Sequence, residues 1–264
     1  GYEVICLDRK LPGTQSVAAS FGQKIKAVWG DITQPVVWEE ALKGIDAVIH
    51  LAAIIPPLSE TNPELATRVN VTATENLIRA MEKQGVRRLI FASSVAVYGK
   101  LQDREPPLTP DSPYRPDDHY GETKLACEKA IHASSLDWSI LRISVAPPVS
   151  VKFIGGSHDF EMIFDIAVNT RIEYVHPADC ALAFANAVAC DEAIGKHLLL
   201  GGGDDYVLDL LGDDLIDGGG GRDELLGMGG NDTIYGGSGV DTIEGGAGND
   251  IIVGDADGSD DIYD

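Results

Sequence analysis

Continuous apolar runs alternate with segments of helical periodicity over residues 1–199. The apolar runs, at 2–7, 25–29, 47–51, 88–92 and 139–144, are predicted to be buried strands. Apolar side chains recur at helical spacing at 63–82, 120–134 and 177–189. Strands that are apolar throughout and separated by helices predict an α/β fold, in which helices cover both faces of a parallel sheet.

Residues 200–264 follow a different rule, a repeat with a period of nine. Each repeat has an aspartate with Gly two positions before it and an aliphatic residue two positions after it: Asp205, Asp214, Asp223, Asp232, Asp241 and Asp250. Asp260 follows at an interval of ten, and Ile262 takes the aliphatic position behind it. The alternative is a disordered acidic linker, but seven aliphatic residues in register favour a folded repeat.

Composition changes abruptly where the repeat begins. Residues 200–264 hold 17 acidic residues against one basic residue, Arg222, for a net charge of −16, whereas residues 1–199 carry only −6 of the total of −22. The segment 200–264 also holds 19 of the 30 glycines. We therefore predict two domains, 1–199 and 200–264.

The net charge of −22 bears on which kinds of molecule the chain can bind. An acidic chain repels phosphate backbones, which disfavours nucleic acid and favours metal cations. No apolar run reaches the length of a membrane-spanning helix. The four cysteines lie among apolar neighbours before the boundary and show no Cys-x-x-Cys spacing: Cys6, Cys127, Cys180 and Cys190. They are predicted to be buried free thiols, which suggests a reducing compartment for this part.

Candidate chemistry in the first domain centres on Tyr120 and Lys124. Residues at positions i and i+4 share a helix face, so the ammonium can lie beside the phenol and lower its pKa from about 10 toward that of a general acid or base. Ser94 leaves the strand at 88–92 and precedes Tyr120 along the chain. A serine, a tyrosine and a lysine in this order are a more specific sign of a catalytic site than the Tyr–Lys pair alone.

Small or polar residues also follow the other predicted strands. Asp8, Asp31 and the pair Ala52-Ala53 stand at strand ends, and ligands of doubly wound sheets bind at the carboxyl ends of the strands. An Asp at such a position can accept hydrogen bonds from an adenosine ribose. The alternative for a single Asp is a turn residue or a helix cap.

In order, these pieces resemble the extended short-chain dehydrogenase/reductase family, the NAD-dependent epimerases and dehydratases of nucleotide sugars. The matching stretches are Leu7-Asp8, Gly30-Asp31-Ile32, 48–53 including Leu51, 70–77, 93–99, Tyr120-x-x-x-Lys124, Leu141-Arg142 and 174–179. The resemblance implies a Rossmann-like, doubly wound parallel sheet that binds NAD or NADP, and a small-molecule substrate such as a nucleotide sugar.

The resemblance also implies roles for single residues. Tyr120 would move a proton on a substrate hydroxyl, Lys124 would hold the nicotinamide ribose, and Ser94 would bind the reacting oxygen. The other implied cofactor-binding residues are Asp8, Arg9, Asp31, Ile32, Leu51, Ala52, Ala53 and Asn70. Asp8 favours NAD, whereas Arg9 could accept the 2′-phosphate of NADP, so NAD is favoured and NADP stays open.

The sequence departs from that family in two places. Family members open with a strand and a Gly-x-x-Gly-x-x-Gly turn that holds the pyrophosphate, but this sequence contains no such motif, and Gly1 matches the residue before the family's second strand. Since the absent strand belongs in the middle of the sheet, its two neighbours are expected to lack a hydrogen-bonding partner. The position after Arg142 where the family has Asn holds Val145. For His176, next to Pro177, a structural role is favoured over a catalytic one.

The repeat resembles the RTX, or haemolysin-type, calcium-binding nonapeptide, most clearly at 236–244 and 245–253. The resemblance implies a parallel β-roll with the aliphatic residues inside and calcium between alternate turns. Asp205, Asp223 and Asp241 would line one edge, and Asp214, Asp232 and Asp250 the other. Flexible ligation by oxygen alone favours Ca²⁺ over softer metals.

Three functional hypotheses follow. The first is an NAD(P)-dependent oxidoreductase of the epimerase/dehydratase type, fused to a calcium-binding roll. The second is a secreted calcium-binding protein whose Rossmann-like domain no longer catalyses, and the third is a join of two unrelated reading frames near Leu200. A native roll predicts type I secretion into calcium-rich surroundings, whereas the dehydrogenase-like part alone predicts the cytoplasm.

Overall fold

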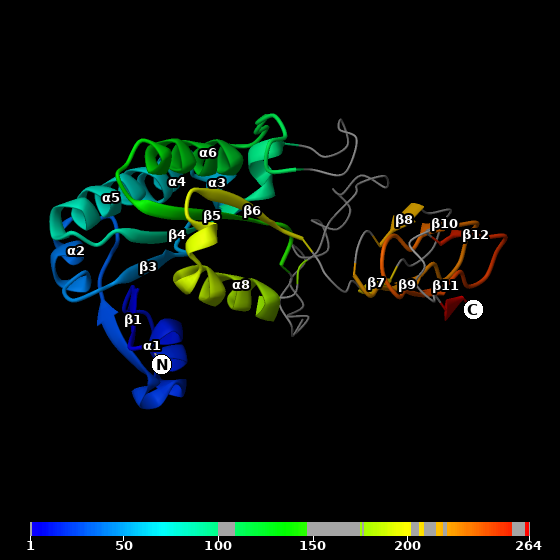
Figure 1. The fold of residues 1–264 in the computed structure, drawn as a ribbon, viewed down its shortest axis with the longest axis horizontal. Coiled ribbons are helices and arrows are strands. Elements are labelled where there is room, and N and C mark those ends of the chain that lie inside the picture. The colour runs from blue at the N-terminus through cyan, green and yellow to red at the C-terminus, as the bar shows by residue number, and fades with distance from the viewer. Residues whose placement is uncertain are drawn as a thin grey trace. The chain divides into compact units, whose positions relative to one another are not determined.

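The computed structural model describes residues 2–99, 109–146, 175, 177–201, 206–208, 215–218, 221–254 and 262–263. They divide into two compact units, both drawn in Figure 1. The first unit comprises the described residues within 1–100, 108–142 and 183–198. The second comprises those within 143–182 and 199–264.

A four-stranded sheet in the order β3-β4-β5-β6 organises the first unit. Its strands are β3 (Ala47–His50), β4 (Arg88–Ser94), β5 (Asp137–Ile143) and β6 (Lys196–Leu200). β3 and β4 pair in parallel, with Ala47 opposite Arg88. Figure 1 shows α5 (Ala73–Gln84) and α6 (His119–His132) on one face of this sheet and α8 (Pro177–Ala189) on the other. The predicted α/β fold with both faces covered is confirmed.

The helix predicted at 63–82 consists of three contiguous segments. α4 (Pro63–Ala66) runs into a π-helical turn, η2 (Thr67–Thr72), which runs into α5. α3 (Leu58–Thr61) precedes them, and α5 ends at Gly85 in the left-handed conformation (φ 75°) that Gly adopts without strain. Periodicity gives no sign of a π turn, which inserts one residue into the helical ladder. Among the described helices, none combines the length and apolarity that crossing a bilayer requires.

The hydrophobic core of this unit lies between the sheet and the helices α5 and α6. Its fully buried side chains include Leu77, Met81, Leu89, Ile131 and Ile140. Burying each such side chain contributes about 1.5–3 kcal/mol. The core therefore fixes α6 on the sheet, and with it any chemistry that α6 carries.

β1 (Val4–Asp8) and β2 (Ile25–Trp29) form a separate two-stranded parallel sheet, with Val4 opposite Ile25. α1 (Pro12–Ser20) and η1 (Gly22–Lys24) connect them, and α2 (Val36–Ala41) follows β2. β1 pairs only with β2 and β3 only with β4, so each strand has one edge that no described strand occupies.

The cysteine prediction is wrong in part. Cys127 and Cys180 are buried, but Cys190 is partly exposed and Cys6 is exposed. Exposure alternates along β1, so Cys6 shares the exposed face with Val4 and Asp8, while Ile5 and Leu7 face the other side. A strand in a two-stranded sheet with one open face exposes every second side chain, and apolar neighbours in the sequence do not reveal this.

The second unit contains a parallel β-roll. Its strands are β7 (Tyr206–Leu208), β8 (Leu215–Asp217), β9 (Glu224–Leu226), β10 (Thr233–Tyr235), β11 (Thr242–Glu244), β12 (Ile251–Val253) and β13 (Ile262–Tyr263). Successive strands alternate between two sheets, ordered β12-β10-β8 and β13-β11-β9-β7. Four aliphatic residues form its core: Ile216, Leu225, Ile234 and Ile243. The β-roll predicted from the repeat is confirmed.

The prediction that every aliphatic residue of the repeat lies inside the roll is wrong for the last one, Ile262. Ile262 lies opposite Thr242 rather than Ile243, and its side chain is 56% exposed. Because the last interval is ten, Ile262 lies 19 residues after Ile243. However, β11 and β13 pair at a separation of 20 and the other described pairs of the roll at 18, so the motif and the pairing differ by a shift of one position. Because side chains alternate between the two faces of a strand, this shift moves Ile262 from the inside to the outside. Tyr263 takes the place opposite Ile243.

Candidate functional site

The structure brings Ser94 and Tyr120 together. Ser94 ends β4, and Asp118 caps the start of α6 by accepting a hydrogen bond from the Gly121 N–H at 2.6 Å. A Cβ atom at Gly121 would lie 2.5 Å from the Ala96 carbonyl oxygen, within η3 (Val95–Tyr98). Glycine at this position therefore lets α6 begin directly against the turn that follows β4. The Ser94 side chain thereby lies close enough to Tyr120 to favour its phenolate form.

Burial dominates the electrostatics of Tyr120 and Lys124. It raises the pKa of Tyr120 to about 12, opposed by the hydrogen bond from Ser94. It also lowers the pKa of Lys124, which is 3% exposed, to about 8. The Lys124 ammonium donates to the Ala92 carbonyl oxygen at 2.6 Å and lies 5.7 Å from the centre of the Tyr120 ring. The expected lowering of the Tyr120 pKa is not met in this structure, because desolvation outweighs the hydrogen bond from Ser94.

A third side chain on α6, Glu128, was not among the candidates. Tyr120, Lys124 and Glu128 follow one another at the i, i+4 spacing and share one helix face. Each lies beside a residue of β4. Tyr120 is close to Ser94, Lys124 donates to the Ala92 carbonyl oxygen, and Glu128 Oε1 accepts from the Ser93 hydroxyl at 2.6 Å. These contacts hold α6 in register with the end of β4. The signal that could have found Glu128 is the continuation of Tyr-x-x-x-Lys, at the same spacing, to an acidic side chain.

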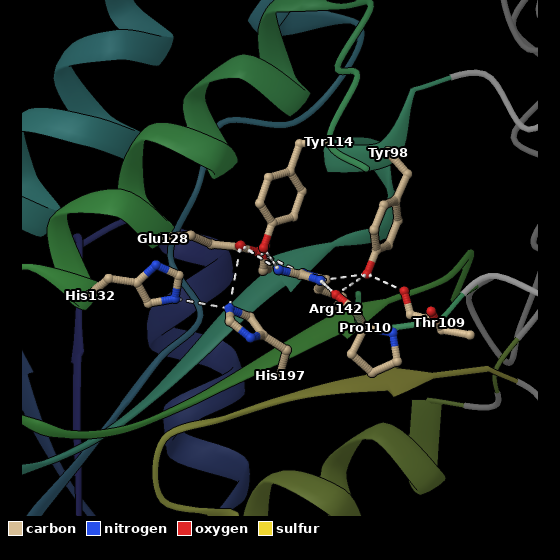
Figure 2. A network of polar contacts seen from close by, with 9 residues as sticks. Tyr98, Thr109, Pro110, Tyr114, Glu128, His132, Arg142 and His197 are labelled. Atoms are coloured by element: carbon tan, nitrogen blue, oxygen red, sulfur yellow. Dashed lines mark hydrogen bonds and ion pairs between the residues drawn. The ribbon is translucent and has the colours of Figure 1, made fainter. Parts of the chain in front are cut away.

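Glu128 also forms a buried ion pair with Arg142 of β5 (Figure 2). Arg142 Nε lies 3.0 Å from Glu128 Oε1, and Nη2 lies 2.7 Å from Oε2. Both side chains are fully buried. The remaining guanidinium donors reach Tyr98, the Pro110 carbonyl oxygen at 2.9 Å and the Tyr114 hydroxyl at 2.7 Å. Arg142, recognised in the sequence only as part of a motif, thus ties β5 to α6 and to the loop before it.

Two histidines border this network. His132 of α6 and His197 of β6 approach through their Nε2 atoms at 2.9 Å, and His197 Nε2 lies 3.8 Å from Glu128 Oε2 (Figure 2). Burial lowers the pKa of both rings. One ring must donate and the other accept, so at least one of the two is neutral. In the part of the chain that the structure describes, no three His, Cys, Asp or Glu residues are grouped to hold a metal ion.

The candidates after β3 occupy two kinds of position. Leu51 is 60% exposed, Ala52 is exposed and Ala53 is partly exposed. Asn70, by contrast, is buried in η2, where its Oδ1 accepts from the Ile54 N–H at 2.7 Å and its Nδ2 donates to the Ile54 carbonyl oxygen at 2.9 Å and to Thr123 Oγ1 at 3.0 Å. Asn70 therefore clamps the segment after β3 to α6.

The candidates on the β1–β2 sheet lie at strand ends, as predicted. Asp8 and Arg9 are exposed at the end of β1, where Asp8 Oδ1 accepts from the Arg9 N–H at 2.6 Å. Asp31 accepts from the N–H and hydroxyl of Thr33 at 2.9 and 2.8 Å, and these bonds lower its pKa. Ile32 packs against the core. The geometry of Asp31 matches the alternative of a turn residue, and its cofactor role stays a prediction. His176 lies outside the described residues.

The roll presents two edges that carry the same polar arrangement. On the Asp223 edge, named for Asp223 and Asp241, the Asp223 N–H donates to Asp241 Oδ1 at 3.0 Å. On the Asp232 edge, named for Asp232 and Asp250, the Asp232 N–H donates to Asp250 Oδ1 at 2.9 Å. The partners of each bond belong to alternate turns, as the repeat implied. Asp205 and Asp214 lie outside the described residues.

A family model matches the part of the chain that carries the Ser94–Tyr120–Lys124 arrangement. The model of the NAD dependent epimerase/dehydratase family covers residues 1–148, which is more than half of the 264 residues. The chain belongs to the NAD-dependent epimerase/dehydratase family. The match also includes the strand and helix that hold Glu128 and Arg142.

The repeats match a second family model, that of the RTX calcium-binding nonapeptide repeat, at residues 200–234 and 226–262. Both resemblances found in the sequence are therefore confirmed. The comparison agrees with the β-roll seen in the second unit.

Curated relatives cover the first part of this epimerase/dehydratase family member. UDP-glucose 4-epimerase of Lactobacillus helveticus is 34% identical over 166 residues, which make up 60% of this chain and 49% of the relative. N-acetyl-alpha-D-glucosaminyl-diphospho-ditrans,octacis-undecaprenol 4-epimerase of Escherichia coli O157:H7 is 40% identical over 103 residues, or 39% of this chain and 30% of the relative. The chain thus spans half or less of the length of these two relatives.

Solved structures agree on the fold. UDP-glucuronic acid 4-epimerase from Bacillus cereus, in complex with UDP-glucuronic acid and NAD, is 21% identical with a TM-score of 0.64, over 76% of this chain and 70% of that one. DesIV, a dTDP-glucose 4,6-dehydratase from Streptomyces venezuelae with NAD and TYD bound, is 24% identical with a TM-score of 0.65, over 76% and 66%. The Rossmann-like fold predicted from the sequence is confirmed.

The described residues fit one part of an NAD site and a cradle for calcium. Ser94, Tyr120 and Lys124 carry the donors and acceptors that the nicotinamide end of NAD would require. In the roll, a Cβ atom at Gly218 would lie 2.7 Å from Asp223 Oδ2 and 2.5 Å from the Gly236 carbonyl oxygen. Oxygen atoms thus converge on a space that only glycine leaves free, which suits a hard cation.

Proposed function

We propose that this chain is the catalytic part of an epimerase/dehydratase-type oxidoreductase joined to a calcium-binding roll, with the boundary between residues 199 and 200. The proposed substrate is a nucleotide sugar, and the reaction takes place at one of its carbons that carries a hydroxyl or carbonyl group. The observation that carries the proposal is the alignment of Tyr120 and Lys124 on α6 with Ser94 on β4. Relatives named as UDP-sugar epimerases support the substrate class.

Each residue has a defined task in this reaction. NAD, when bound, supplies the hydride acceptor. Tyr120 moves the proton at the substrate hydroxyl, and Ser94 holds the same oxygen by a hydrogen bond. With a pKa of about 12, the phenol carries its proton at pH 7. Lys124 is placed to hold the cofactor ribose, and its positive charge favours the phenolate when Tyr120 acts as a base.

The test begins with cofactor binding. We expect the 264-residue chain to bind NADH weakly, because its sequence has no Gly-x-x-Gly-x-x-Gly turn and no described strand lies between β1 and β3. A fluorescence titration with NADH measures this, and micromolar affinity would contradict it. The experiment is repeated with a chain extended at Gly1 by the first strand and glycine turn of a UDP-glucose 4-epimerase.

The extended chain tests the assignment of Tyr120. Tyr120→Phe should abolish epimerisation of a UDP-sugar while leaving NADH affinity within about twofold, because only the proton-carrying hydroxyl is removed. Equal loss of affinity and turnover would assign Tyr120 a structural role. An extended chain that binds NADH but converts no UDP-sugar would exclude the proposed substrate class.

A second candidate is calcium binding without catalysis, and the separation of the β1–β2 sheet from the β3–β6 sheet favours it. In either case the roll should take up calcium, with Asp205, Asp214, Asp223, Asp232, Asp241 and Asp250 as ligands. We expect the β signal in circular dichroism to rise in millimolar Ca²⁺ and to respond much less to Mg²⁺, which demands tight octahedral geometry. A signal that is equal with and without calcium would exclude the roll as a calcium module.

A further inference from the structure

The two edges of the roll match in backbone and carboxylate geometry. The Asp–Asp hydrogen bond measures 3.0 Å on the Asp223 edge and 2.9 Å on the Asp232 edge. A Cβ atom at Gly227 would lie 2.5 Å from Asp232 Oδ2 and 2.7 Å from the Gly245 carbonyl oxygen, close to the values at Gly218. A difference in cation binding between the edges must therefore come from other side chains.

The residue before each aspartate differs between the edges. On the Asp223 edge it is Arg222 and Val240, whereas on the Asp232 edge it is Asn231 and Asn249. The outer turns do not offset this difference, because Asp204 and Asp213 precede Asp205 and Asp214. Arg222 is the sole basic residue of 200–264, so the Asp223 edge has the only positive side chain of the repeat sequence.

At the equivalent positions, the Asp232 edge has two asparagines that contact each other. Asn231 Oδ1 accepts from the Asn249 N–H at 3.0 Å and lies 3.3 Å from Asn249 Nδ2. This contact joins alternate turns, and its donor lies on the later turn, whereas the donor of the aspartate bond lies on the earlier turn. It holds the two turns together without adding charge.

We propose that the two edges bind calcium unequally, the Asp232 edge more tightly than the Asp223 edge. The inference rests on the calcium binding proposed above. Arg222 adjoins Asp223 in the chain, so its charge lies within roughly one Debye length of a cation held there. At that range, repulsion between the single charge of Arg222 and the double charge of Ca²⁺ lowers the affinity for calcium on the order of threefold in a water-like dielectric. The asparagine contact adds to the difference by ordering the turns of the Asp232 edge.

The test is a calcium titration of the full chain by calorimetry after treatment with EDTA. Asp250→Asn should remove the tighter sites, and Asp241→Asn should remove the weaker ones. The control is the exchange variant R222N/N231R, which keeps the composition and the net charge and moves the arginine to the other edge. Arg222 and Asn231 are both exposed, and the exchange also removes the contact of Asn231 with Asn249, so both sources of the proposed difference are lost from the Asp232 edge. In this background, the effects of Asp250→Asn and Asp241→Asn should reverse.

The titrations distinguish a roll that binds no calcium from a roll whose two edges bind it equally. If the chain takes up no calcium, the calcium function itself is excluded. If it takes up calcium but Asp241→Asn and Asp250→Asn lower the affinity equally in both backgrounds, the edges are equivalent and only the inference is overturned. A single variant, Arg222→Asn, gives an independent check, because it should tighten the weaker class about threefold.

Discussion

At the scale of the residue, Met228 stands out in the roll. Its φ of 63° lies in the left-handed region, at the position where later repeats have Gly237 and Gly246 with φ of 90°. A non-glycine residue in that region destabilises the folded state by roughly 1–2 kcal/mol. Replacing it with glycine lowers the free energy of unfolding by about 0.4–1 kcal/mol, because glycine gives the unfolded chain more conformational freedom. Met228→Gly should therefore stabilise the calcium-loaded roll by about 0.5–1 kcal/mol.

Thermal unfolding of the roll in saturating calcium, followed by circular dichroism, measures this gain. The matched control is Met228→Ala, which keeps a Cβ atom and should gain little. If Ala and Gly raise the melting temperature equally, backbone strain at residue 228 is not the cause.

His50 makes a prediction about pH. It is buried beside Thr74, with Nε2 2.9 Å from Thr74 Oγ1, and burial lowers its pKa to about 3. In the unfolded chain the pKa is about 6.5, so between these values the unfolded state binds more protons. Stability is therefore lost as pH falls below about 6.5, by about 1.4 kcal/mol per pH unit from this residue.

His50→Gln keeps a polar group and removes the titration, so its stability should depend less on pH between about 6 and 4. Urea unfolding followed by tryptophan fluorescence measures this, since Trp29, Trp38 and Trp138 all precede the roll. Parallel stability curves for the variant and the parent chain would assign the acid sensitivity to other groups, among them His132 and His197, whose pKa values are also lowered.

At the scale of the element, the attachment of α6 depends on the Glu128–Arg142 pair. Glu128→Ala leaves the Arg142 guanidinium fully buried without its anion, which should cost about 3–5 kcal/mol in urea unfolding. The control is Arg87→Ala, which breaks the largely exposed pair between Arg87 and Asp137 and should cost much less, because water screens this pair. Similar losses in both variants would show that the buried pair does not anchor the helix.

Most elements were predictable from the sequence, and the contacts between them were not. Apolar runs located β2 and periodicity located α8, because both depend on local pattern. The π turn at Asn70 and the bond from Glu128 to Ser93 depend on packing between distant segments, for which a single sequence gives no signal. The candidate site follows the same division: Ser94, Tyr120 and Lys124 came from a motif, and Glu128 needed the structure.

At the scale of the whole molecule, calcium should act on one part of the chain. All three tryptophans lie before residue 200, whereas the charge of −16 is in 200–264. EDTA should therefore reduce the β signal in circular dichroism, because the acidic edges repel one another without a cation. The urea midpoint measured by tryptophan fluorescence should stay within error. A shift of that midpoint on chelation would show that the roll stabilises the α/β part.

The architecture of the whole chain was predictable because each part has its own strong signal. The period of nine defines the roll, and the ordered strand and helix patterns define the α/β fold. The exposure of Cys6 and Ile262 was not predictable in the same way. Both depend on which face of a strand is covered, and a pairing partner or a shift of one position decides that.

The register of β13 has a consequence for the spacing of side chains along the roll. The other described strand pairs of the roll join residues 18 apart, whereas β11 and β13 pair at a separation of 20. Both separations are even, so each position keeps its inside or outside face from one turn to the next. An insertion of an odd number of residues between turns therefore moves the aliphatic residue of the motif to the outside, whereas an even insertion leaves it inside.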